Sequence, residues 1–220
     1  MRDGFLLDPL LSATGVAHGF GLRASPSIPD VRRPEQVHGA HIVRLSVREV
    51  GELGEADGIV SDRPGVPVAV VTADCVPVLL ASRSGRCVAA IHAGWRGLAA
   101  GVVSAGVRAL GQLTDGEPLQ AAIGPHIGCC CYEVDGPVVR ALRARFGASL
   151  EEALFPARSL HWRLALSRLV RCDLLRAGVD PAAISLRWAA CTCCAADRFH
   201  SFRRDGESAG RLLHWVAARE

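Results

Sequence analysis

Short apolar runs rich in valine and isoleucine recur along the chain, and each is bounded by Gly, Pro, Ser or Asp. Runs of this length between turn-forming residues are typical of buried β-strands. The pattern predicts strands at 41–45, 68–72, 76–81, 87–91, 119–123 and 184–189.

Three longer segments carry apolar residues at helical spacing. They predict helices from Gly97 to Leu113, from Gly136 to Phe146 and from Leu166 to Ala177. Pro137, near the start of the second segment, and Gly178, just after the third, occupy positions that these residues favour at helix ends. Strands interspersed with helices predict an α/β (α+β) fold with mixed strand pairing.

The composition is that of one folded unit. The chain has 220 residues, of which 50% are hydrophobic, and it contains no internal repeat or low-complexity linker, so we expect a single domain over residues 1–220. The first residues hold no apolar run long enough for a signal peptide or a membrane span, which predicts a cytoplasmic protein without a membrane partner. The net charge of +3 comes from scattered arginines, so no nucleic-acid surface is expected.

The cysteine and lysine contents narrow the chemistry. Nine cysteines without a secretion signal predict thiols or metal ligands rather than a disulfide framework. The groups at 129–131 and at 191–194 do not supply two matching CxxC pairs, which favours buried thiols over a second metal site. All 25 basic residues are arginines, so Schiff-base and P-loop lysine chemistry are excluded.

Three segments place potential metal ligands beside Gly or Pro at the ends of predicted strands. His38 lies in EQVHG, Cys75 in TADC and His92 in HAGWRG. Two imidazoles and a thiolate suit zinc, and three protein ligands leave one coordination position open, as in catalytic sites. The spacing permits these side chains to converge, but it equally fits a surface turn with a buried thiol and two ordinary histidines.

Two further segments suggest binding of an anion and a base. In HAGWRG, a predicted strand, a glycine-bracketed loop and a helix N-terminus together favour anion binding, and Arg96 adds a positive charge. Near the C-terminus, aromatic Phe199 and Phe202 accompany arginines that include Arg203, a combination able to sandwich a base and hold an anion. The alternative for this segment is a hairpin turning at Asp205 and Gly206.

Together these segments resemble a known family. EQVHG, ADGIVSD, TADCVPVLL, HAGWRG, GPHIGCCCYEV, CT at 191–192 and SFRRDGESAGR occur here in the order typical of the purine nucleoside phosphorylases once called multicopper polyphenol oxidases or laccase-domain proteins. The resemblance covers about residues 15–215, and TADC followed by HAGWRG is its most specific part.

The resemblance implies layered mixed β-sheets flanked by helices, and one zinc ion held by His38, Cys75 and His92. It implies phosphorolysis of adenosine, inosine, guanosine and methylthioadenosine, together with deamination of adenosine. Some bacterial members look instead like peptidoglycan editing factors that remove serine from a UDP-muramic acid precursor. In this chain, the residues to which the matching motifs and the chemistry point are Asp74, Cys75 and Arg96 for catalysis, and Arg23, Gln36, Arg96, Cys191, Phe202 and Arg203 for binding purine nucleoside and phosphate.

One departure from the family pattern affects the expected substrate pocket. The family usually has a glycine-rich stretch containing Asn between HGFxxR and QxHG, whereas here Ala24 to Glu35 makes this connection and the chain contains no Asn. We expect part of the pocket to be shortened or rebuilt, with the zinc ligands retained.

Other functions compete with this expectation. A copper polyphenol oxidase is disfavoured because none of the eight histidines forms an HxH pair of the kind that fills a trinuclear copper cluster. Cys75 activated by His92 would make a metal-free cysteine hydrolase. A truncated pocket would make a nucleoside-binding protein without turnover. The sequence does not predict an oligomeric state.

Overall fold

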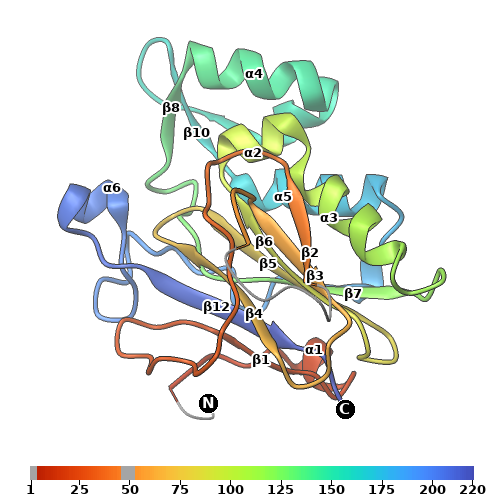
Figure 1. Ribbon diagram of the computed structural model, residues 1–220. Helices are drawn as coiled ribbons and strands as arrows, with labels where there is room; N and C mark the ends of the chain where they lie inside the picture. The colour runs from red at the N-terminus through yellow and green to blue at the C-terminus, as the bar shows by residue number, and fades with distance from the viewer. Residues whose placement is uncertain (1–3, 46–52) are drawn as a thin grey trace.

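A large mixed sheet forms the centre of the computed structural model, which describes residues 4–45 and 53–220 (Figure 1). Its strand order is β11-β7-β5-β6-β3-β2. β11 pairs parallel to β7 and β2 pairs parallel to β3, whereas the other neighbours are antiparallel. The strands are β2 (Ile42–Leu45), β3 (Gly58–Ser61), β5 (Val76–Ser82), β6 (Val88–Ala93), β7 (Leu119–Ile123) and β11 (Ile184–Ser185).

The central strands are buried on both faces, which explains their uninterrupted apolar sequence. Every residue of β5 is buried. Val78 and Leu80 belong to one apolar cluster, which they share with helical residues. Leu79 and Ala81 point the other way, into a second cluster. Because side chains alternate along a strand, one continuous apolar run supplies two cores and predicts a layer on each side of the sheet.

The second core lies between the large sheet and a three-stranded antiparallel sheet of order β1-β12-β4. These strands are β1 (Ala17–Phe20), β4 (Pro67–Thr72) and β12 (Leu212–Ala217). A small sheet of order β8-β10-β9 completes the strands, with β8 (Glu133–Asp135), β9 (Leu154–Pro156) and β10 (His161–Leu164). The layers on either side of the large sheet are visible in Figure 1.

Helices cover the opposite face of the large sheet. α3 and α5 lie there, and α4 is stacked beyond α2 near β8 and β10 (Figure 1). The α-helices are α1 (Pro9–Ser12), α2 (Trp95–Ala100), α3 (Val102–Gly111), α4 (Gly136–Phe146), α5 (Leu166–Arg176) and α6 (Phe202–Asp205). Short 3₁₀ segments are η1 (Gly147–Ala153), η2 (Pro181–Ala183) and η3 (Gly206–Ser208).

The sequence-based fold prediction is confirmed: the chain has a mixed α/β fold with layered sheets flanked by helices. Three local predictions need correction. The helix predicted from 97 to 113 is two helices, because Gly101 adopts a left-handed conformation with φ 86° between α2 and α3. The strand predicted at 184–189 is only Ile184–Ser185, and the alternative hairpin at Asp205 and Gly206 is instead α6 followed by η3.

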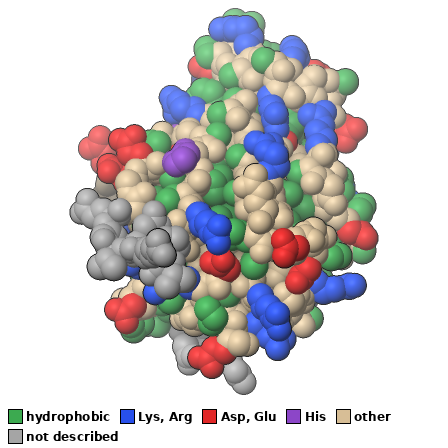
Figure 2. Space-filling model, turned by 45° about the vertical axis from the view of Figure 1, so that its right-hand side comes forward, with side chains coloured by type: hydrophobic (Ala, Val, Ile, Leu, Met, Phe, Trp, Pro, Cys, Tyr) green, Lys and Arg blue, Asp and Glu red, His purple; other side chains and the backbone are tan. Residues whose placement is uncertain are grey.

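The surface carries charges of both signs. On the face shown in Figure 2, arginine and acidic side chains are interspersed among hydrophobic and other side chains rather than gathered by sign. Within residues 4–45 and 53–220, no helix combines the length and the apolar character that crossing a membrane requires.

Candidate metal centre

Strand register brings Cys75, His92 and Asp57 together. β5 and β6 are antiparallel, with Val76 opposite Ala93 and Pro77 opposite His92. Cys75 therefore lies just before β5, beside the end of β6. On the other side of β6, β3 is also antiparallel and Gly58 faces Ile91, so Asp57 directly precedes β3 next to His92. The starts of β3 and β5 and the end of β6 thus lie side by side at one end of the strands.

Asp57 holds the two histidines in place. One of its carboxylate oxygens, Oδ1, accepts hydrogen bonds from His92 Nδ1 at 2.7 Å and from the His38 backbone N–H at 2.9 Å. The other oxygen accepts the backbone N–H groups of Val37 and Gly39. Since Asp57 is fully buried and occupies Nδ1 of His92, the imidazole presents Nε2 toward Cys75.

His38 occupies a tight turn rather than a strand. Its backbone has φ 59°, in the left-handed region, and Gly39 follows it. The three N–H groups of this turn point at Asp57, so the same carboxylate holds the backbone of His38 and the imidazole of His92. His41, three residues later, is exposed and outside this arrangement.

The ligand atoms of His38, Cys75 and His92 all lie within 4.8 Å of one another. The two imidazole rings meet edge to face with centroids 4.8 Å apart. Gly94 closes the space around them, because a Cβ at this position would lie 3.0 Å from Cys75 Sγ and 3.2 Å from His38 Cδ2. A soft thiolate, two imidazoles and a carboxylate that orients one of them form a donor set that fits a divalent transition metal.

The electrostatics of the centre favour a thiolate beside the imidazoles. Burial opposes ionisation of Cys75, but hydrogen bonds with His38 and His92 outweigh it and lower the pKa of the thiol to about 7. Burial also opposes the charge on His92, whose hydrogen bonds to Asp57 and Cys75 nevertheless raise its pKa to about 9. Asp57 and Cys75 therefore favour a positive charge on His92, and His38 and His92 favour a negative charge on Cys75.

The three ligands open onto a cavity of about 620 Å³. Aromatic side chains in its wall are Trp95, Tyr132 and Phe202, and Phe202 is 51% exposed. The remaining charged and amide side chains that line it are Arg33, Glu35, Gln36, Asp74, Arg96, Arg203 and Arg211. Another cavity of the same volume, beside the ends of α3 and α5, is lined by no histidine, cysteine or aromatic residue.

Several of the sequence-predicted binding residues line this cavity, but not all have a free polar group. The Gln36 amide makes two hydrogen bonds with the backbone of Val71, at 2.7 and 2.8 Å, so it braces β4. The Arg203 guanidinium donates to the carbonyls of Cys131 and Glu133. Arg96 lies 4.5 Å from the ring of Trp95 and forms no ion pair with another described residue.

Arg23 and Cys191, predicted to bind substrate, do not line the cavity. The Arg23 guanidinium donates to the carbonyls of Ala196 and Phe199. Cys191 lies among other cysteines instead. The structure thus separates these two residues from His38, Cys75 and His92.

Asp74 lines the cavity but is held by other protein groups. Its carboxylate accepts hydrogen bonds from the hydroxyls of Thr192 and Ser201 and from the backbone N–H of Arg203. Its backbone has φ 90°, an unusual conformation for a residue other than glycine. Asp74 therefore links the loop before β5 to the segment that leads into α6.

Sequence reasoning missed residues that the fold places at the centre. Asp57 lies in ADGIV, where an acidic residue immediately before a buried strand was the available signal. Tyr132 follows the cysteine run, Glu35 is the first residue of EQVHG, and Arg33 lies two residues before it, without any spacing that indicates a site. Their role depends on long-range register, which residue spacing does not reveal.

Comparison with known proteins gives the family of this chain. The family model described as multi-copper polyphenol oxidoreductase laccase matches residues 21–219. The chain belongs to this family. A purine nucleoside phosphorylase from Xylella fastidiosa is 39% identical over 198 residues, which cover 87% of this chain and 73% of that protein. The purine nucleoside phosphorylase YfiH of Escherichia coli is 36% identical over 182 residues, covering 83% of this chain and 71% of YfiH.

A solved structure of the family has the same fold. The crystal structure of YlmD from Geobacillus stearothermophilus matches with a TM-score of 0.87 at 27% sequence identity, over 100% of both chains. The family resemblance inferred from the motifs is thereby confirmed. Relatives that carry the name purine nucleoside phosphorylase support an enzymatic function, and the family's laccase-like description is consistent with a metal in the site.

Proposed function

We propose that this protein is a zinc-dependent purine nucleoside phosphorylase that also deaminates adenosine. The proposal rests mainly on one observation: two histidines and a cysteine, oriented by a buried carboxylate, lie at a cavity whose wall combines aromatic rings and arginines. Purine bases, sugars and phosphate are recognised by this combination of stacking surfaces and fixed positive charges.

The donor set favours zinc over copper. His38, Cys75 and His92 supply two nitrogens and one sulfur, which suit zinc and leave one coordination position open. A multicopper oxidase needs several further histidines in HxH pairs, and the sequence contains no HxH pair. When bound here, zinc would supply a Lewis acid at the floor of the cavity.

Different residues of the cavity wall would bind the purine base and the phosphate. Trp95, Tyr132 and Phe202 offer ring faces on which a purine can stack. Arg96 and Arg33 line the same cavity and would neutralise phosphate as it attacks C1′ of the ribose, while the bond from C1′ to the base breaks. The departing base then needs a hydrogen-bond donor or a proton.

We assign the proton donor for the leaving base to Tyr132, and the proton transfers of deamination to Glu35. Burial raises the pKa of Tyr132, so its phenol stays protonated at neutral pH and can donate to the leaving base. Glu35 lines the cavity and supplies a carboxylate for the proton transfers that deamination requires. Asp74, whose carboxylate already accepts three hydrogen bonds from the protein, would instead position Arg203 and the adjoining loop.

The test is product analysis with inosine and with adenosine, each with and without phosphate. We expect hypoxanthine and ribose 1-phosphate from inosine only when phosphate is present, and inosine from adenosine when phosphate is absent. Cys75→Ser should remove the metal of this centre and reduce both reactions to background, because the thiolate ligand is lost.

Cys87→Ser is the matched control, since Cys87 is a buried thiol that does not line the cavity. It should retain metal and turnover. Full activity in zinc-free protein would support Cys75 as a nucleophile and contradict the metal mechanism. Release of serine from UDP-muramyl-serine without any reaction of nucleosides would assign the site to peptidoglycan precursors instead.

A further inference from the structure

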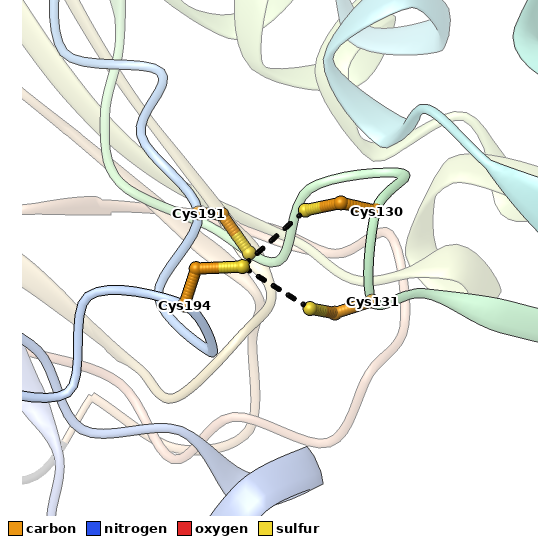
Figure 3. Close-up of side chains that lie close together, drawn as sticks. All are labelled: Cys130, Cys131, Cys191 and Cys194. Carbon is orange, nitrogen blue, oxygen red and sulfur yellow. Dashed lines mark hydrogen bonds between the residues drawn. The ribbon is translucent and has the colours of Figure 1, made fainter.

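Four cysteines from two distant segments converge outside the cavity (Figure 3). Cys130 and Cys131 belong to the loop between β7 and β8, whereas Cys191 and Cys194 belong to the loop after β11. We name this group the cysteine cluster. The expectation that these thiols are simply buried is wrong, because Cys130 and Cys194 are exposed and the four sulfurs face one another.

The spacing of the sulfurs fits a shared metal ion. All four Sγ atoms lie within 4.8 Å of one another, with Cys194 at 3.6 Å from Cys130 and 3.4 Å from Cys131. Four sulfurs around a zinc ion, each at about 2.3 Å from the metal, lie about 3.8 Å apart in a tetrahedron. A disulfide would require about 2.05 Å between two sulfurs, which is well below both of these distances.

The backbone is shaped to bring these sulfurs together. A Cβ on Gly128 would lie 3.1 Å from Cys130 Sγ and 3.1 Å from Cys191 Cβ, so glycine allows the two loops to approach. A bridge between His126 and Cys191 joins the loops, with the Thr192 N–H donating to the His126 carbonyl.

Arginines from α6 fix both loops from outside. Arg204 donates to the carbonyls of Thr192 and Cys193, and Arg203 donates to the carbonyls of Cys131 and Glu133. These arginines hold backbone groups rather than sulfur atoms. The cluster is therefore braced at its periphery, and its sulfurs remain available to a cation.

We propose that Cys130, Cys131, Cys191 and Cys194 form a tetrathiolate zinc site, separate from the His38–Cys75–His92 centre. Four soft sulfur donors suit zinc, and a zinc site filled by four protein ligands is structural rather than catalytic. Each thiol loses its proton as its Zn–S bond forms, so binding releases protons to solvent. The exposed Cys130 and Cys194 give the ion a path from solvent.

The proposed ion would stiffen one wall of the cavity. Tyr132 directly follows Cys131 and lines the cavity. Thr192, adjacent to Cys191, donates a hydrogen bond to Asp74 at 2.6 Å, and Asp74 precedes the metal ligand Cys75. The cluster thus joins the loop that carries Tyr132 to the loop that supports Asp74.

The test is the metal content of the full chain, purified with zinc under reducing conditions. We expect about two equivalents of zinc in the wild-type protein and about one in Cys194→Ser and in Cys130→Ser. Cys129→Ser is the matched control, because Cys129 adjoins Cys130 but lies outside the cluster, and it should keep both ions. Cys75→Ser should lose only the ion of the other centre, so the two sites are scored independently of enzymatic activity.

Two results would overturn the proposal. One is an unchanged zinc content in Cys194→Ser and Cys130→Ser. The other is a disulfide between Cys194 and Cys130 or Cys131, found by non-reducing peptide mapping of the zinc-loaded protein. If the cluster variants do not fold, the absorption spectrum of cobalt-loaded Cys75→Ser tests the proposal instead. We expect the intense thiolate-to-cobalt charge-transfer absorption of a four-sulfur site. The absence of this absorption would contradict the assignment.

Discussion

The two groups of potential metal ligands are built differently. His38, Cys75 and His92 lie in a turn and at strand ends of the large sheet, around the fully buried carboxylate of Asp57. The cysteine cluster joins two loops, is partly exposed, and is braced by hydrogen bonds to its backbone. The first group opens onto a cavity, and the residues of the second do not line it.

This difference suits the first group to a catalytic role and the cysteine cluster to a structural one. A site with three protein ligands and an adjoining cavity has room for a substrate, whereas four sulfurs satisfy a tetrahedral ion completely. In the proposed function, the first site would need a rigid frame, because its open coordination position would face the substrate. The proposed zinc site in the cysteine cluster would need only to hold two loops together. Four predictions test this distinction, the cavity beside the first group and the scaffold on which that group is built.

Asp57→Asn should have the largest effect, and only on the His38–Cys75–His92 centre. Asp57 accepts N–H donors on both carboxylate oxygens, and an amide NH₂ in place of one oxygen would face the donors of Val37 and Gly39. We expect zinc affinity at this centre to fall by about 10- to 100-fold. Competition with a chelator measures it, and Asp62→Asn on the exposed Arg44–Asp62 pair is the control. Equal weakening of the cysteine cluster would contradict the separation.

Arg96→Ala should raise the KM for phosphate by about tenfold, because a charge-assisted hydrogen bond contributes about 1.5 kcal/mol or more. Arg96 lines the cavity, whereas the Arg23 guanidinium is bound to carbonyls elsewhere. Steady-state phosphorolysis of inosine at varied phosphate measures the effect. Arg23→Ala should leave this KM unchanged, and a larger effect in Arg23→Ala would reverse the assignment of the phosphate site.

Acid should destabilise the scaffold on which the strand-end site is built. His214 is fully buried, and its Nδ1 accepts the Gly21 N–H while Nε2 bonds to Thr72. Burial, with a smaller contribution from His92, lowers its pKa from 6.5 to about 3. Between these two pH values the unfolded chain binds one more proton than the folded protein, so the free energy of unfolding falls as pH decreases.

The expected slope from His214 is about 1.4 kcal/mol per pH unit. Denaturant unfolding of metal-free protein between about pH 6 and pH 4, which lies between the two pKa values, measures it. His214→Gln should flatten the profile by that amount, whereas His41→Gln at an exposed position should not. An unchanged profile in His214→Gln would mean that this imidazole is not kept neutral by folding.

Matched alanine substitutions at Gly94 and Gly128 should have the smallest effects and distinguish the sites most directly. A Cβ on Gly94 approaches Cys75 and His38, whereas one on Gly128 approaches Cys130 and Cys191. Because the neighbours must shift by only a few tenths of an ångström, we expect about 1 kcal/mol of strain and roughly fivefold weaker zinc binding at the adjacent site. Zinc titration should show each variant affecting its own site alone.

Much of the fold follows from local pattern. Apolar runs located β4 to β7, and helical spacing located α4 and α5, because burial on one or two faces imposes a period on the sequence. The helix predicted from 97 to 113 was divided by Gly101, whose left-handed conformation no periodicity indicates. The predicted strand at 184–189 was shortened because only Ile184 and Ser185 pair with β7.

The candidate centres depended on different information. His38, Cys75 and His92 were proposed from motifs, and the structure brings their ligand atoms together. Asp57 was missed because its partner His92 is 35 residues away and only the pairing of β3 with β6 joins them. Cys191 and Cys194 were interpreted as buried thiols, although they form a CxxC pair, because the matching Cys130 and Cys131 lie far earlier in the chain, 64 and 63 residues from Cys194.

The amino-acid sequence by itself determined the family, the alternation of strands and helices, and the residue types able to bind a metal. These are properties of neighbouring residues and of ordered motifs. Only the tertiary structure decided which of the nine cysteines meet, which carboxylate orients a histidine, and which arginines face the cavity. The reason is physical: coordination and hydrogen bonding act over a few ångströms, and long-range strand pairing sets those distances.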